Sequence, residues 1–347
     1  MDNKNLDNWL QRRKDRMDSL TAEMLFTGIE KGDITALSSG ITLVESETPK
    51  HGIEAQKLVQ LCLPKSGQSI RVGITGVPGV GKSTFIESFG KLLAEEGRKV
   101  AVLAIDPSSS VSGGSILGDK TRMNDLAVTE NVFIRPSAAG STLGGVARKT
   151  RESILLCEAA GFNIILIETV GVGQSETVVK SMVDFFLLLM LSGAGDELQG
   201  IKKGIMEMAD ALVITKADGD NVVKAKIASR EYKNALHLFP ANHNDWISKV
   251  FTCSAITGEN ISKVLEVIDS FENQTKLNGH FEKSRIEQDK MWLSETLKEM
   301  ILSGFYSSPE LMEALKQSEN KMDRGEITSF QAAEELFEIY KKHAGKI

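Results

Sequence analysis

The stretch Gly76-Val77-Pro78-Gly79-Val80-Gly81-Lys82-Ser83 follows an apolar run at residues 72–75 and precedes a segment, 84–93, with helical apolar spacing. This order predicts a strand, a glycine-rich loop and a helix, and the spacing matches the phosphate-binding loop of nucleotide-binding proteins. Backbone N–H groups of such a loop cradle phosphate oxygens, and the N-terminus of the helix adds a positive potential. We expect Lys82 to contact the β- and γ-phosphates and Ser83 to bind Mg²⁺, with Thr84 completing the nucleotide-binding set. A glycine-rich turn with a chance lysine is the alternative, and the flanking strand and helix disfavour it.

Length and composition set limits on the class of protein. The 347 residues suffice for one large domain with extensions or for two domains, and 41% hydrophobic with 25% charged residues is typical of a soluble globular protein. A net charge of -6 argues against non-specific binding of nucleic acid. Cys62, Cys157 and Cys253 lie far apart with no C-x-x-C pair, which favours small buried thiols over a disulfide framework or a zinc site. A reducing, cytoplasmic environment fits this pattern.

The sequence predicts neither a secretory signal nor a membrane-spanning helix. The first twenty residues are charged throughout and lack the apolar centre of a signal peptide. The longest apolar run, at 185–191, is too short to cross a bilayer as a helix and is typical of a fully buried parallel strand.

The middle of the chain alternates between short apolar runs and helical patterns. Further strands are predicted at 99–105, 131–135, 163–168, 184–191, 211–215 and 249–253. Short strands separated by helices predict an α/β fold with a mostly parallel sheet covered by helices on both faces. Ligands of such a sheet bind at the carboxyl ends of its strands.

Helical patterns flank this region on both sides. We expect a helical N-terminal extension over residues 1–62, a nucleotide-binding domain over 63–275 and a helical region over 276–347. Ser308 followed by Pro309 is a typical helix start. The amphipathic C-terminal helices could pack on the chain's own core or form an arm for self-association.

Two acids follow predicted strands and are candidates for a magnesium site. Asp106 comes just after the second strand, where a carboxylate can reach the metal shell or hold the attacking water; a plain helix-capping aspartate is the alternative. Glu168 closes the fourth strand before a glycine-rich segment, or is a structural acid there. Gln174 stands three residues after Gly171 rather than next to it, so no water-positioning glutamine is assigned and slow hydrolysis is expected.

Residues 215–218, Thr-Lys-Ala-Asp, resemble the guanine-specificity motif N-K-x-D. The carboxylate of Asp218 can accept from both the ring N–H and the exocyclic amine of guanine, a pair that adenine lacks. Lys216 would lie along the plane of the base. Threonine at 215 replaces the usual asparagine, so the part of the motif that braces the loop is expected to be altered. The base site is completed by Ser254, Ala255 and Ile256, where the alternative is a turn without a ligand.

Two glycine-rich segments remain. Residues 111–122 suit a segment that the γ-phosphate orders, or an ordinary long surface loop. Residues 192–207 follow the most apolar strand and hold paired acids and paired lysines, which suggests a third mobile element or a solvated loop.

The chain closely resembles the MeaB/ArgK family of G proteins, which belong to the SRP/MinD-like class of phosphate-loop NTPases. The residues that carry the resemblance are GVPGVGKSTFIE (76–87), VLAIDPSSSVSGGSILGDKTRM (102–123), IETVGVGQSE (167–176), SGAGDELQGIKKGIMEMAD (192–210) and ITKADGDN (214–221). It extends from about residue 20 to near the C-terminus.

The resemblance implies a GTPase that binds GTP with Mg²⁺, hydrolyses it slowly and acts as a chaperone of the adenosylcobalamin enzyme methylmalonyl-CoA mutase. It also implies a homodimer joined by the C-terminal helices. Lys82, Asp106 and Glu168 are then the catalytic candidates, and Ser83, Asp106, Asp119 and Glu168 are the magnesium ligands. The family's extra switch matches residues 192–207. The candidates there for coupling nucleotide state to the partner are Asp196, Gln199, Lys202 and Lys203.

Two other functions stay open from the sequence. One is an ATPase or kinase of an arginine/ornithine transport system, a label long attached to this family, which a preference for ATP over GTP would support. The other is a metallochaperone GTPase of the same class, although five scattered histidines and no paired cysteines argue against it.

Overall fold

The computed structural model describes residues 19–105, 123–136, 143–169, 175–193, 203–237 and 245–344. The chain divides into two compact units between Gln288 and Asp289, a boundary that falls within helix α13 (His280–Ser307). In the described part of the chain, no helix is both long and apolar enough to span a membrane.

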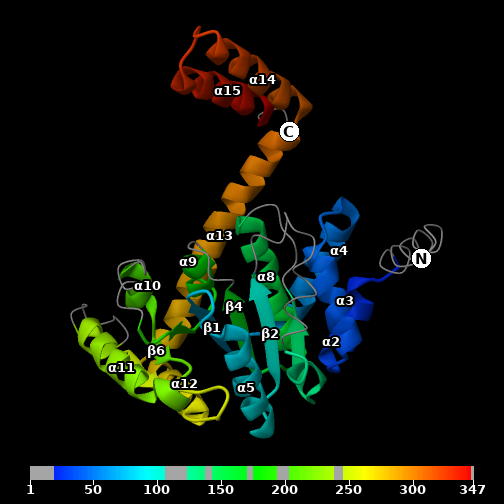
Figure 1. Cartoon of the computed structure of the whole chain (residues 1–347). Helices are drawn as coiled ribbons and strands as arrows, with labels where there is room; N and C mark the ends of the chain where they lie inside the picture. Colours follow the sequence, from blue (N-terminus) through cyan, green and yellow to red (C-terminus); the bar gives the residue numbers. More distant parts are fainter. Residues whose placement is uncertain are drawn as a thin grey trace, which may run out of the picture. The chain divides into compact units, whose positions relative to one another are not determined.

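A seven-stranded parallel sheet forms the centre of the first unit, as the sequence predicted (Figure 1). Its strands are β1 (Ile70–Gly76), β2 (Val100–Ile105), β3 (Val132–Arg135), β4 (Ile164–Thr169), β5 (Phe185–Met190), β6 (Ala211–Ile214) and β7 (Lys249–Thr252). Their order is β3-β2-β4-β1-β5-β6-β7, and every neighbouring pair is parallel. Strand β1 therefore lies at the centre, and the loop that follows it opens at the carboxyl edge of the sheet.

Alternate residues of the strands enter two separate hydrophobic layers because successive side chains of a strand point to opposite faces. In β5, Phe186, Leu188 and Met190 belong to one layer, whereas Phe185, Leu187 and Leu189 belong to the other. All six are buried, which explains why this strand has an uninterrupted apolar sequence.

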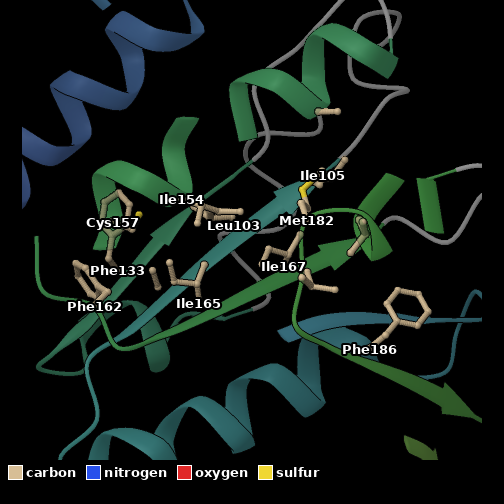
Figure 2. Packing of buried hydrophobic residues seen from close by; sticks show 14 of the residues in the cluster. Leu103, Ile105, Phe133, Ile154, Cys157, Phe162, Ile165, Ile167, Met182 and Phe186 are labelled. Carbon is tan, nitrogen blue, oxygen red and sulfur yellow. The ribbon is translucent and has the colours of Figure 1, made fainter. Parts of the chain in front are cut away.

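Helices cover both faces of the sheet, as expected. The helices that contribute buried residues to the first layer are α2 (Ala22–Glu30), α3 (Ile34–Glu45), α4 (Pro49–Cys62), α8 (Leu143–Ala159), α9 (Ser175–Lys180), α10 (Lys203–Met208) and α11 (Val222–Leu236). Helices α5 (Lys82–Glu95) and α12 (Ile261–Leu277) cover the second. Figure 2 shows the first layer, where Ile154 and Cys157 of α8 pack over Leu103 and Ile165 of the sheet.

The N-terminal helices begin where polar side chains cap them. Thr21 accepts from the backbone N–H of Met24 at the start of α2, and Asp33 accepts from that of Thr35 at the start of α3. The described part of the expected helical N-terminal extension, residues 19–62, forms the three helices α2, α3 and α4. The three predicted small buried thiols are confirmed, since Cys62, Cys157 and Cys253 are buried and free.

The second unit consists of the last part of α13 with α14 (Pro309–Asp323) and α15 (Ser329–Ala344). The predicted helix start is confirmed, because the Ser308 hydroxyl accepts from the N–H of Leu311 and Pro309 is the first helical residue. Phe305 of α13 contacts Tyr340 of α15 with ring centroids 5.9 Å apart.

A buried ion pair joins α8 to the amino edge of the sheet, the edge at which the parallel strands begin. The Arg71 guanidinium at the start of β1 donates from Nε and Nη2 to the two oxygens of Glu158, at 3.0 and 3.1 Å. Glu158 also accepts from the Ser69 hydroxyl at 2.6 Å and the Gly67 N–H at 2.7 Å. Burial alone would raise the pKa of Glu158, but the charge of Arg71 and these hydrogen bonds outweigh it, and the pKa is lowered from its usual 4.5.

We predict that Glu158→Gln lowers the free energy of unfolding by about 3 kcal/mol at pH 7, because it leaves Arg71 buried without its carboxylate. The contribution of a carboxylate with a lowered folded pKa is present above its unfolded value and is lost as the pH falls through the folded value. The difference between wild type and variant should therefore be full at pH 7 and shrink below about pH 4.5. Urea unfolding of the nucleotide-free protein at several pH values measures it.

Glu130→Gln is the control, since Glu130 is an exposed acid. A difference between wild type and Glu158→Gln that stays constant down to about pH 3 would contradict this account of the ion pair.

Candidate nucleotide-binding site

The phosphate-binding loop follows β1 as predicted, and its glycines are dictated by space and backbone geometry. A Cβ atom on Gly76 would lie 2.5 Å from the backbone oxygen of Leu189 in β5, so no side chain fits there. Gly81, at the N-cap of α5, has a φ of 92°, a left-handed value that glycine adopts without strain. Together these residues bring the chain from the central strand into helix α5 with its first N–H groups exposed toward the carboxyl edge.

Lys82, the first residue of α5, folds back over the loop. Its Nζ donates to the backbone oxygen of Gly76 at 2.9 Å. Burial lowers the pKa of Lys82, while the charges of Glu168 and Glu176 oppose that shift. An ammonium group that is partly removed from water and held at the mouth of the loop gains more from an anionic ligand than an exposed lysine does.

Two predicted magnesium ligands come together beside the loop. The Ser83 hydroxyl lies 3.4 Å from Oε1 of Glu168, which is buried in β4. The hydroxyls of Thr75 and Thr169 form a 2.8 Å hydrogen bond that joins the ends of β1 and β4. This bond keeps Glu168, the residue before Thr169, beside the phosphate-binding loop. Asp106 and Asp119, the other two predicted ligands, lie outside the described residues.

The base-recognition residues converge at the ends of β6 and β7. The Ser254 hydroxyl donates to Oδ2 of Asp218 at 2.5 Å and accepts from the N–H of Thr257 at 3.1 Å. Because Ser254 is fully buried, it fixes the orientation of the Asp218 carboxylate. Ala255 and Ile256 follow in the same turn, with Ile256 largely exposed at the surface.

Thr215, which replaces the usual asparagine, joins the end of β6 to the phosphate-binding loop. Its hydroxyl donates to the backbone oxygen of Val80 in the phosphate-binding loop at 2.8 Å, and Thr215 is buried. Lys216 adds a second connection, because its Nζ donates to the oxygen of Gly79 at 2.8 Å. The sequence did not predict these contacts, because only the approach of the two loops reveals them.

The predicted partner-coupling residues are only partly described. Asp196, Gln199 and Lys202 lie outside the described residues. Lys203 is the first residue of α10, and its side chain is not described.

Comparison with known proteins places this site in a family. Residues 37–310 match the family described as methylmalonyl Co-A mutase-associated GTPase MeaB. The chain belongs to the MeaB family. It is a GTPase with the fold of a phosphate-loop NTPase.

Relatives of the MeaB-family chain span nearly its whole length. The GTPase ArgK of Escherichia coli is 46% identical over 84% of this chain and 88% of its own. The mitochondrial methylmalonic aciduria type A homolog of Mus musculus is 45% identical over 92% of this chain and 79% of its own. The crystal structure of an LAO/AO transport system kinase has a TM-score of 0.73 and 36% identity, covering 92% of this chain and 97% of that one.

We predict that Thr215→Val weakens the binding of both GDP and GTP about tenfold. Valine keeps the size of the side chain but leaves the buried oxygen of Val80 without its donor, a loss of roughly 1–3 kcal/mol. Titration with a fluorescent guanine nucleotide measures the effect. Thr215→Ser, which keeps the hydroxyl, should bind as wild type does, and equal losses in the two variants would show that the hydroxyl is not the brace.

Proposed function

We propose that this GTPase is a cytoplasmic chaperone of adenosylcobalamin-dependent methylmalonyl-CoA mutase, which uses GTP binding and hydrolysis to control loading of the cofactor and to protect and reactivate the mutase. The family match over residues 37–310, whose description names the mutase, carries the proposal. The relatives in Mus musculus and Caenorhabditis elegans, both named methylmalonic aciduria type A homologs, support it.

In this proposal GTP binds with Mg²⁺. The Ser83 hydroxyl and the Glu168 carboxylate are hard oxygen donors 3.4 Å apart, which fits an ion that prefers oxygen ligands. When bound, the ion would neutralise charge on the phosphate oxygens. Lys82 would neutralise the same phosphates from the loop, and Asp106 with Asp119 remain proposed additional ligands.

The base end of the site favours GTP in the same proposal. Ser254 holds one carboxylate oxygen of Asp218 and so orients the group that would accept from guanine. Adenine offers an acceptor where guanine has its ring N–H, so a fixed carboxylate repels it.

The similarity to the LAO/AO transport system kinase favours a second candidate, an ATP-dependent kinase or ATPase of a transport system. The two functions differ in nucleotide. Competition of ATP and GTP for the site separates them: a preference for GTP supports the chaperone proposal, and a preference for ATP supports the kinase.

The direct test of the chaperone proposal is co-purification with methylmalonyl-CoA mutase. We expect the purified protein to bind the mutase with an affinity that differs between the GTP-loaded and GDP-loaded states. Absence of association in both states would remove the chaperone function and leave the GTPase intact. In the same assay, Lys202→Ala combined with Lys203→Ala should keep intrinsic hydrolysis and lose stimulation by the mutase; equal loss of both would refute a coupling role for these lysines.

We also propose that the chain forms a homodimer through its C-terminal helices. Leu293, Leu297, Met300 and Ile301 of α13 are each between 45% and 71% exposed. Their spacing places them on one stripe of the helix, and an exposed apolar stripe of this kind marks an interaction surface.

We predict that Leu297→Glu combined with Ile301→Glu converts the dimer to a monomer, because two carboxylates cannot be buried in an apolar contact without partners. Light scattering coupled to gel filtration measures the mass. Lys298→Glu, an exposed position outside the stripe, is the control and should stay dimeric. A dimer that persists in the double variant would place the contact elsewhere.

A further inference from the structure

The base-recognition loop, residues 215–221 after β6, contains one energetically unfavourable backbone conformation. Lys216 has a φ of 54°, in the left-handed region that costs a residue with a Cβ roughly 1–2 kcal/mol. Such a conformation persists only where the surroundings stabilise it. Thr215, before it, contacts the phosphate-binding loop, and Asp218, after it, contacts Ser254. The backbone conformation of Lys216 therefore sets the position of Asp218 relative to Thr215.

Asn221 supplies the support from within the same loop. Its Nδ2 donates to the backbone oxygen of Lys216 at 2.7 Å, and its own N–H donates to the oxygen of Asp218 at 3.0 Å. Asn221 lies at the end of the 3-10 turn η4 (Gly219–Asn221) and directly precedes α11. Asn221 therefore anchors the base-recognition loop to the N-terminus of α11.

The other end of the Asn221 amide reaches a different loop. Its Oδ1 accepts from the Ser192 hydroxyl at 2.6 Å, and Ser192 lies just beyond the end of β5. The orientation of the amide is forced, because a backbone oxygen can only accept and therefore must face the NH₂ group. The carbonyl side of the amide is then the only part that can receive the hydroxyl proton of Ser192.

We propose that Asn221 is a positioning residue for guanine-nucleotide binding and that its amide links the base-recognition loop to the chain leaving β5 at Ser192. Occupancy of the base site and protection of the backbone at Ser192 are then coupled, and such a coupling acts equally in both directions. The link uses the base end of the nucleotide alone, so GDP is sufficient to engage it.

The first test is Asn221→Ala, with Asn234→Ala on the exposed face of the following helix α11 as a matched control. We expect the dissociation constants of GDP and GTP to rise about tenfold, in line with the loss of one hydrogen bond that holds a strained loop. The hydrolysis rate at saturating GTP should stay within about twofold, since the described hydrogen bonds of Asn221 reach no residue of the phosphate-binding loop. An unchanged affinity for GDP, or a fall in the saturated rate that matches the loss of affinity, overturns the positioning role.

The second test isolates the link and does not depend on how well the first variant folds. Ser192→Ala removes the donor to Asn221 and keeps the donor to Lys216. Hydrogen exchange of the peptide that contains Leu191, Ser192 and Gly193 is measured with and without saturating GDP. We expect GDP to slow this exchange at least about threefold in wild type and not in Ser192→Ala, and the affinity for GDP to fall by no more than that same factor. The same slowing in both proteins, or in neither, overturns the link.

Discussion

The contact between Gly76 and β5 is the constraint on which the nucleotide site depends. Strand β1 lies between β4 and β5, and its last residue pairs with Leu189 so closely that a Cβ atom would lie 2.5 Å from the Leu189 oxygen. The chain can therefore leave the sheet at its centre and turn at once into α5. Because buried strands on both sides hold β1, the phosphate-binding loop starts from a fixed point, and its N–H groups need little reorganisation to receive an anion.

The loops for base and phosphate form one connected unit. Thr215 and Lys216, at the end of β6, donate to the oxygens of Val80 and Gly79 in the phosphate-binding loop. The two bonds span sequence separations of 135 and 137 positions. They use backbone oxygens, which only accept hydrogen bonds and therefore do not bind phosphate. A nucleotide that binds at one end therefore meets an already positioned site at the other, which reduces the ordering cost of binding.

The sequence predicted the parts of this protein that local patterns determine. All seven strands and the phosphate-binding loop follow from apolar runs, glycine spacing and the residues around them. The bracing role of Thr215 and the double contact of Asn221 could not be predicted, because each depends on the approach of loops that are distant in sequence. The close packing around Gly40 of α3 could not be predicted either, because side chains of Ile29, Leu58 and Leu156, from three other helices, lie 3.1 Å from where its Cβ would be.

Charged side chains have different roles at the two edges of the sheet that the amino and the carboxyl ends of its strands form. At the amino edge, Arg71 pairs with Glu158, Arg285 with Asp184, and Lys180 with Asp210. Each pair also bonds to backbone or hydroxyl groups, so these charges stabilise the fold. At the carboxyl edge, Lys82 donates to the backbone oxygen of Gly76 and is attracted by the charges of Glu168 and Glu176, and Glu168 accepts from the Ser83 hydroxyl. A lysine and a buried carboxylate beside the open phosphate-binding loop suit an anionic ligand and its metal ion, because the ammonium group attracts phosphate and the carboxylate supplies a hard oxygen donor.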